Sequence, residues 1–261
     1  METLLSNRFE FEEKEILGVG VHAATMGQAL DAIDVAIKQK QRLMIGVVNA
    51  AKMVNMRKNP DLWEDVTSSD LVLADGMSVV HASRMLSASL PERVTGIDLM
   101  EGILERGDSE GYRVYCLGAK EEILKTVVER FEEKYPGVNI VGRRNGYFND
   151  EDEAEIAKEI GSLDVDVLFV AITSPKKERF MARWADVINT TVVHGVGGSF
   201  DVVAGFVERA PESWQRLGLE WLYRVKQEPG RLWKRYLVTN LSFLRIVLGS
   251  WFTGLFRRKA R

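Results

Sequence analysis

Short apolar segments alternate with segments of helical periodicity over most of the chain. Seven apolar runs predict strands, at residues 16–21, 43–48, 71–74, 113–118, 138–142, 167–172 and 191–196. Several runs are apolar at successive positions, as strands buried between two layers of helices must be. The sequence therefore predicts an α/β fold with a doubly wound, mostly parallel, Rossmann-like sheet.

The segments between the apolar runs carry helix signals. In 121–135 apolar residues recur every fourth position, which is typical of a helix with one buried face. Segment 149–163 begins with Asn149 as an expected cap, and 174–189 begins with Ser174 followed by proline. We expect one helix in each segment.

The pattern changes near residue 205. Beyond it the chain has no strand signal and is rich in Trp, Leu and Arg. We expect two parts, an α/β core at 1–205 and a helical, basic C-terminal appendage at 206–261. No internal repeat or low-complexity linker separates them.

Composition is typical of a soluble globular protein, with 46% hydrophobic and 28% charged residues. The single cysteine, Cys116, excludes an internal disulfide and favours a reducing cytoplasm. The first fifteen residues lack an apolar core, so we expect no secretory signal.

The net charge of -3 hides an asymmetry between the two parts. From Arg209 onward the chain carries 12 Lys and Arg against three acids, a balance of +9, which leaves -12 for residues 1–208. An acidic body with a basic tail predicts an anionic partner for the tail, namely phosphate, nucleic acid or a membrane surface.

Polar and glycine-rich turns follow several predicted strands, where open α/β sheets bind their ligands. The candidates are Asn49, Asp75 with Gly76, Gly118, Lys176 with Lys177, and Gly197 with Gly198. Backbone N–H groups at such turns suit a diphosphate, and the lysines add positive charge. The same residues are consistent with a helix cap, a solvated turn acid, solvated first-turn lysines and sterically required glycines, and the turns alone leave both interpretations open.

No metal site is indicated. The acidic segment at 164–166, "DVD", precedes a predicted strand, so it falls at the edge opposite the expected ligand site. His22, His81 and His194 are scattered and form no ligand-spaced cluster with Cys116.

Taken together, eight segments in order resemble the WecG/TagA/CpsF glycosyltransferase family (glycosyltransferase family 26). They are "VVNAAKMV", "LVLADGMSVVHASRML", "PERVTGIDLMEGIL", "CLGAKEEILK", "RRNGYF", "SPKKERFM", "HGVGGSFDVVAG" and "ERAPESWQRLGLEWLYR". The match as a whole runs from about residue 15 to residue 236, and "ADG" followed by "PERVTGIDL" is more specific than any single glycine turn.

The resemblance implies a hexosyltransferase that moves a sugar, with inversion and without a metal or other cofactor, from a UDP-sugar to a polyprenyl-diphosphate-linked saccharide. Such enzymes build bacterial cell-surface polysaccharides at the inner face of the cell membrane, as cytoplasmic, peripherally associated proteins. In this comparison Asp75 takes the position of the catalytic base and Arg93 that of an active-site arginine. The tail arginines, Arg209, Arg224, Arg231 and Arg235, are candidate diphosphate ligands on an appendage that closes over the site.

Two positions depart from the family pattern. Val47 stands where teichoic-acid members often have threonine, and the family's "PKQE" is "PKKE" here, with Lys177 replacing glutamine. The donor therefore stays open among UDP-GlcA, UDP-Glc and UDP-ManNAc, and an exopolysaccharide-pathway member is one interpretation. Our hypothesis for Lys177 is that it pairs with a hexuronate carboxylate or with diphosphate.

Segment 236–256 has 21 residues and one charge, Arg245. Its length allows a membrane span, but a central arginine costs about 2.5–3.5 kcal/mol on insertion scales. We favour docking on an anionic membrane surface, with Trp233 and Trp251 at the headgroups. A helix packed in a homo-oligomer is the alternative.

Two other classes of protein are alternatives to a glycosyltransferase. A nucleotide-binding oxidoreductase would need a glycine fingerprint after the first strand, and "GVGVHAATMG" matches it poorly. A non-enzymatic membrane or nucleic-acid-binding module would explain the basic tail. The Leu, Val and Phe interleaved in the tail favour lipid over bases, so we expect no nucleic-acid partner.

Overall fold

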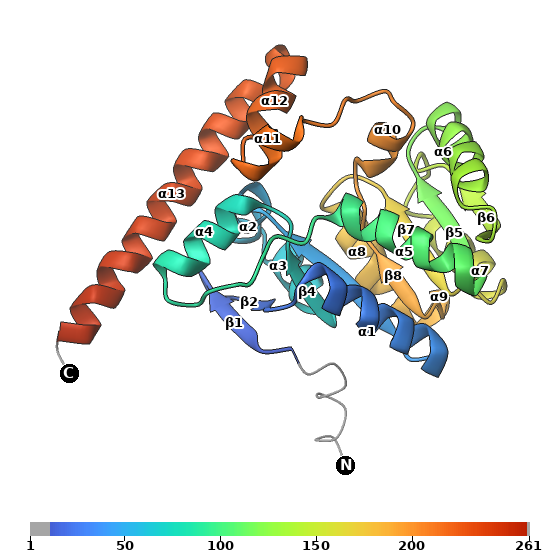
Figure 1. Ribbon diagram of the computed structural model, residues 1–261, viewed down its shortest axis with the longest axis horizontal. Coiled ribbons are helices and arrows are strands. Elements are labelled where there is room, and N and C mark those ends of the chain that lie inside the picture. Colours follow the sequence, from blue (N-terminus) through green and yellow to red (C-terminus); the bar gives the residue numbers. More distant parts are fainter. Residues whose placement is uncertain (1–10, 260–261) are drawn as a thin grey trace.

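A six-stranded parallel sheet forms the centre of the protein in the computed structural model (Figure 1), which describes residues 11–259 apart from the side chains of residue 231 and residues 254–259. The strand order is β4-β3-β8-β7-β5-β6. The strands are β3 (Leu43–Val48), β4 (Leu71–Ala74), β5 (Arg113–Gly118), β6 (Asn139–Arg144), β7 (Val167–Ala171) and β8 (Val192–His194). Every neighbouring pair is parallel, so all six strands end at the same edge of the sheet.

Helices cover both faces of this sheet. They are α1 (Met26–Gln39), α2 (Ala50–Met56), α3 (Pro60–Thr67), α4 (Met77–Met85), α5 (Gly96–Glu110), α6 (Glu121–Lys134), α7 (Glu153–Gly161), α8 (Lys176–Arg183), α9 (Ala185–Ile188) and α10 (Ser199–Val203). Apolar residues of α1, α5 and α6 form one core cluster with the strands, and those of α7, α8 and α9 form another. The predicted doubly wound α/β class is confirmed.

The prediction of a single strand at 16–21 is wrong. Residues 16–21 contribute to an antiparallel hairpin of β1 (Glu13–Ile16) and β2 (Val19–His22), which forms its own small sheet. The turn residues Leu17 and Gly18 both have positive φ, at 55° and 85°, as a two-residue hairpin turn requires. Because Leu17 is buried beside the strand residues, the apolar run continues through the turn and conceals it.

Two predicted helices differ from those in the structure. The helix expected at 149–163 begins only at Glu153, because Asn149 forms a turn in which its N–H donates to the Asp152 carboxylate at 2.9 Å. The helix expected at 174–189 is divided at Trp184 into α8 and α9. The first difference lies at the polar start of its segment, where periodicity gives little signal, and the second lies in mid-segment, where Trp184 packs against the core.

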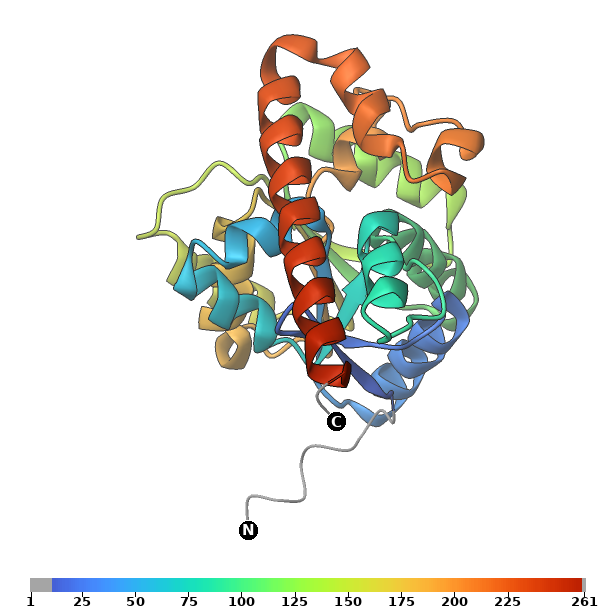
Figure 2. The ribbon, with the colours of Figure 1, turned by 90° about the vertical axis from the view of Figure 1, so that its left-hand side faces the viewer.

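The C-terminal segment is helical, as expected, and consists of α11 (Glu212–Arg216), α12 (Glu220–Gln227) and α13 (Pro229–Lys259). Helix α13 runs along one side of the core (Figure 2) and buries Phe243 and Val247 in the cluster formed by α2, α3, α4 and the hairpin. Among the residues described, no helix is long and apolar enough to cross a membrane. The domain boundary at 205 stays a prediction.

Candidate active site

The polar turns predicted from the sequence meet at the carboxyl edge of the sheet. Asn49 follows β3, Asp75 follows β4, and Gly197 lies three residues beyond the end of β8. Gly118 ends β5, while Lys176 and Lys177 begin α8 after β7. The parallel order of the strands, and not proximity along the chain, brings these residues together.

Asp75 is held by hydrogen bonds to both carboxylate oxygens. The side-chain N–H of Asn49 donates to Oδ2 at 3.2 Å, and the backbone N–H of Gly96 donates to Oδ1 at 3.1 Å. Gly96 is the first residue of α5, so the carboxylate also faces the positive end of that helix. Asp75 is half-buried, so it is a fixed acid at the edge of the sheet and not a freely solvated turn residue.

Asn49 and Gly76 shape the turn around this carboxylate. Asn49 caps α2 by accepting from the N–H of Lys52 at 3.0 Å while it donates to Asp75, so the cap and site interpretations both hold. A Cβ at Gly76 would lie 3.1 Å from the Cβ of Asn49. Glycine at this position lets the two turns approach each other.

His194, which the sequence did not single out, supports the same group of residues from the end of β8. It is completely buried, and its Nε2 lies 2.9 Å from the carbonyl oxygen of Gly96. Burial lowers the pKa of His194 to about 4, against the opposing effect of that hydrogen bond. The neutral ring therefore donates to Gly96, whose own N–H donates to Asp75. A polar residue ending a buried apolar run was the available signal.

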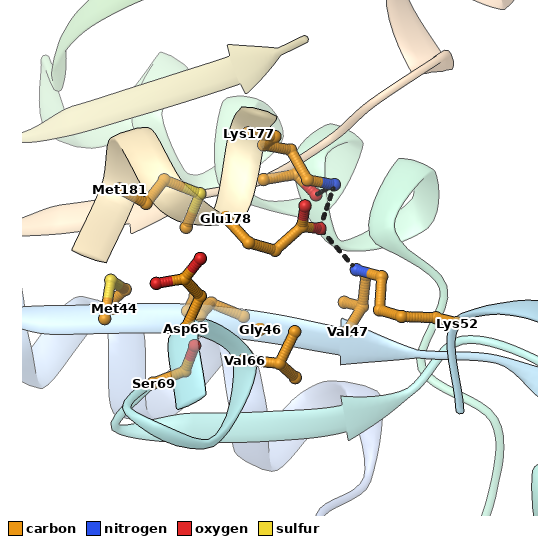
Figure 3. Close-up of a pocket in the computed structure, with 12 residues that line it drawn as sticks. Met44, Gly46, Val47, Lys52, Asp65, Val66, Ser69, Lys177, Glu178 and Met181 are labelled. Carbon is orange, nitrogen blue, oxygen red and sulfur yellow. Dashed lines mark hydrogen bonds and ion pairs between the residues drawn. The ribbon is translucent and has the colours of Figure 1, made fainter. Parts of the chain in front are cut away.

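Three buried charged side chains lie beside these turns (Figure 3). The Glu178 carboxylate contacts the ammonium of Lys52 at 2.8 Å and that of Lys177 at 3.5 Å, and none of the three side chains is more than 10% exposed. Lys177 also donates to the carbonyl oxygen of Gly195 at 3.3 Å. They border a narrow cavity of about 10 Å³, roughly the space of one water molecule.

The pKa values of Lys177 and Glu178 in this cluster are strongly shifted. Burial, together with the neighbouring charge of Lys52, lowers the pKa of Lys177 to about 8, although Glu178 and Asp75 oppose the shift. For Glu178 burial raises the pKa, but the two ammonium groups outweigh burial and leave the pKa at about 2. Lys177 and Glu178 are thus both ionised at neutral pH, and the cluster holds two lysines against one carboxylate. The interpretation of Lys177 as a solvated first-turn residue is wrong.

The neighbouring lysine behaves differently. Lys176 donates to the carbonyl oxygen of Phe148 at 2.6 Å and lies 4.2 Å from the centre of that ring. It ties the start of α8 to the loop after β6. Lys52 and Glu178 were absent from the predicted site, although both fall in the segments that carry the family resemblance.

Gly118 marks the point where the chain connections diverge, since β5 continues to β6 on one side and β7 continues to β8 on the other. Its φ is +132°, and a Cβ there would lie 2.4 Å from the carbonyl carbon of Ala171. Ligands of open α/β sheets bind at such a switch point. Gly197, with φ +54°, lies beside the Lys177 ammonium, and Gly198 is exposed before α10.

The predicted arginines take different positions. Arg93 pairs with Glu220 of α12 at 2.7 Å, and Arg209 pairs with Asp98 of α5 at 2.5 Å. Arg224 and Arg235 are exposed on α12 and α13. The side chain of Arg231 lies outside the described residues. Arg93 and Arg209 are thus held by two different acids, Glu220 and Asp98.

The appendage borders the Asp75 turn directly. Gly218, between α11 and α12, has φ +72°, and a Cβ there would lie 2.9 Å from the Cβ of Met77. Met77 opens α4, two residues after Asp75. Together with the Arg93–Glu220 ion pair, this contact places the start of α12 next to the candidate site.

The acidic segment at 164–166 lies at the amino edge of the sheet, as expected. Asp166 accepts from the N–H of Arg113 at 2.9 Å and pairs with Lys40 at 3.1 Å. Within residues 11–259 no group of three or more His, Cys, Asp or Glu side chains is arranged to hold a metal ion. A reaction without a metal remains a prediction.

A fixed carboxylate, a topological switch point and buried cations at the carboxyl edge of a doubly wound sheet are typical of an α/β enzyme that binds an anionic ligand. The model of the glycosyl transferase WecG/TagA/CpsF family matches residues 14–257. The chain belongs to this family and is a glycosyltransferase, as its motifs indicated.

Two relatives are named N-acetylglucosaminyldiphosphoundecaprenol N-acetyl-beta-D-mannosaminyltransferase. The protein of Bacillus spizizenii is 31% identical over 237 residues, covering 91% of this chain and 88% of the relative. That of Bacillus subtilis is 36% identical over 201 residues, covering 77% of each. Both alignments thus cover more than three quarters of this chain and of each relative.

Proposed function

We propose that the protein transfers a hexose derivative from a UDP-sugar to a polyprenyl-diphosphate-linked saccharide, with inversion at the anomeric carbon and Asp75 as general base. The names of the two relatives, which specify a sugar on diphosphoundecaprenol as the acceptor, support the acceptor class. The protein would thereby act in the assembly of a bacterial cell-surface polysaccharide.

The geometry of Asp75 is the observation that carries this proposal. Its carboxylate is fixed by Asn49 and Gly96 at the edge of the sheet and stays half-buried. In the reaction it takes the proton of the acceptor hydroxyl as that oxygen bonds to the anomeric carbon. The bond from the anomeric carbon to UDP breaks on the opposite face, and UDP leaves with the electron pair.

The charge on the departing diphosphate needs donors from the protein. The buried excess cation of the Lys52–Glu178–Lys177 cluster lies at the same edge as Asp75, and fixed charges in a poorly solvated site act strongly on developing charge. Arg93 and Arg209 are further candidates, because a guanidinium binds phosphate in a bidentate manner. We expect full activity in EDTA; loss restored by magnesium would contradict metal independence.

The test is Asp75→Asn, with transfer followed by mass spectrometry on a polyprenyl-diphosphate disaccharide. We expect unchanged folding and a rate about 10²–10⁴-fold lower, as for loss of a general base. Asp164→Asn is the matched control, since Asp164 is 77% exposed at the opposite edge of the sheet. A fully active Asp75→Asn protein would remove Asp75 from the mechanism.

The donor is tested in the same assay with UDP-GlcA, UDP-Glc and UDP-ManNAc. The ammonium of Lys177 would favour a donor with a carboxylate, such as UDP-GlcA, if it reaches the sugar. Strict use of UDP-ManNAc would oppose a role for Lys177 in donor choice.

The appendage is the proposed membrane contact. Its exposed large apolar side chains on α13 are Trp233, Leu237, Val238, Leu241, Leu244 and Phe252. Apolar and cationic side chains on one helix suit an anionic lipid surface. We expect salt-sensitive binding to anionic vesicles; binding that only detergent reverses would favour insertion.

A further inference from the structure

An apolar groove runs between α12 and α13. It has a volume of about 390 Å³ and is lined by Trp221, Val225, Trp233, Leu237, Asn240, Leu241 and Leu244. On α13 the lining residues recur at intervals of three or four, so they form one stripe along the helix. The volume falls within the range of small-molecule sites, about 300–1,000 Å³.

The groove is separate from the packing of α13 on the core. Phe243 and Val247 face the core and are at most 7% exposed, whereas Leu237 and Leu241 are 49% and 58% exposed. The helix is thus apolar on two sides, and only one side is covered by this chain. A second apolar side of this size indicates a binding partner.

One end of the groove adjoins the candidate active site. Trp221, which lines the groove, follows Glu220, the residue that holds Arg93. The preceding turn, at Gly218, contacts Met77 beside the Asp75 turn. A ligand whose reacting group lies near Asp75 and which continues along α12 would enter the groove.

The charges around the groove fit a ligand with an anionic head. The ammonium of Lys234 lies 5.5 Å from the ring of Trp233, a lining residue. Arg224 is exposed on α12, one helical turn after Glu220 and Trp221. Cations beside an apolar channel complement a diphosphate joined to a hydrocarbon chain.

We propose that this groove binds the first isoprene units of the acceptor's polyprenyl chain, with the diphosphate at the end near Glu220. This inference rests on the proposed function, because it assigns the lipid part of that acceptor to a site. A bilayer surface would contact all exposed apolar residues of α13 alike, whereas a single prenyl chain would contact the groove residues alone.

The direct test is a titration of the full-length protein with farnesyl diphosphate in detergent-free buffer, followed by tryptophan fluorescence, since Trp221 and Trp233 line the groove. We expect saturable binding, and Leu241→Glu and Leu244→Glu should each weaken it about tenfold or more. Val238→Glu is the matched control, because Val238 is 55% exposed on the same helix and does not line the groove. Its affinity should equal that of the wild type.

Two ligand controls separate the parts of the acceptor. Inorganic diphosphate and farnesol should each bind more weakly than farnesyl diphosphate. Equal affinity for inorganic diphosphate would overturn the proposal, since the groove would then add nothing. Equal weakening by the groove and control variants would also overturn it, because binding would then not depend on the groove. Concentration-dependent self-association abolished by Leu241→Glu, without prenyl binding, would assign it to a second copy of the chain.

This assay needs neither a sugar donor nor transfer, so its failure is distinguishable from failure of the proposed function. If farnesyl diphosphate binds but no sugar transfer occurs, the assignment of the groove stands and the proposed reaction is contradicted. If Leu241→Glu still transfers sugar and prefers long-chain over short-chain acceptors as the wild type does, the proposed reaction stands and the assignment of the groove is contradicted.

Discussion

Lys177→Gln is expected to stabilise the protein. The side chain of Lys177 is 8% exposed, and it shares one carboxylate, that of Glu178, with Lys52. Replacing it by glutamine converts two cations and one anion into a one-to-one buried pair. The substitution therefore removes a charge that the fold holds at a cost.

The magnitude follows from the pKa of Lys177, which burial lowers from 10.5 to about 8. Lowering a pKa by one corresponds to about 1.4 kcal/mol, so holding this ammonium charged at pH 7 costs on the order of 3 kcal/mol of unfolding free energy. Below pH 8 the folded and unfolded states both hold the proton, and the cost is fully present. Between pH 8 and 10.5 the unfolded chain binds the proton that the folded protein has released, so wild-type stability rises with pH.

The assay is urea unfolding of wild type and variant at pH 7 and at pH 10. The variant should be more stable by about 3 kcal/mol at pH 7, and the difference should shrink toward zero at the higher pH. Lys125→Gln is the control, because Lys125 is 67% exposed in a surface ion pair and should change stability by less than about 0.5 kcal/mol. A variant less stable than wild type at pH 7 would refute the reasoning, since the contacts of Lys177 with Glu178 and Gly195 would then outweigh its burial.

Three further outcomes are expected. Glu178→Gln should lower the unfolding free energy by about 3–5 kcal/mol, because it leaves two ammonium groups buried without a counterion; a loss under about 1 kcal/mol in urea unfolding would mean that water reaches the cluster. For His194 burial lowers the pKa from 6.5 to about 4, so the wild type loses stability as pH falls through this window, where only the unfolded chain binds the proton. His194→Gln should reduce this loss of stability at acid pH. Substitution of the exposed His81 by glutamine should leave the loss unchanged. Cys116 is completely buried, and burial raises the pKa of its thiol to about 12; it should not react with a disulfide reagent at pH 8 until the protein unfolds, and rapid labelling of the native protein would contradict its burial.

A stabilising substitution at Lys177 would also bear on function. Residues that cost stability are commonly retained for activity, and Lys177 lies at the same edge of the sheet as Asp75. The substitution to glutamine, the residue expected from the family pattern, should therefore separate the two properties. We expect a more stable protein with altered donor use.

The sequence predicted the sheet well because its strands are buried on both faces and their apolar runs are continuous. It also predicted that Asn49 and Asp75 both follow strands of the sheet, at the edge where open α/β sheets bind their ligands. The prediction of a single strand at 16–21 was wrong because Leu17 is buried inside a hairpin turn. Periodicity reports burial, and burial alone does not distinguish a strand from two strands joined by an apolar turn.

By itself the sequence determined the fold class, the helical character of the tail and the membership in a glycosyltransferase family. These features depend on local patterns and on short motifs that each lie within one segment. Only the tertiary structure decided that His194 contacts Gly96, whose N–H donates to Asp75. It also decided that Glu178 pairs with both Lys52 and Lys177, and that Trp221, next to Glu220, lines an apolar groove. The contacts of His194 with Gly96, of Gly96 with Asp75 and of Glu178 with Lys52 join residues far apart in the chain. The burial that shifts the pKa values of these groups exists only once the helices have packed on the sheet.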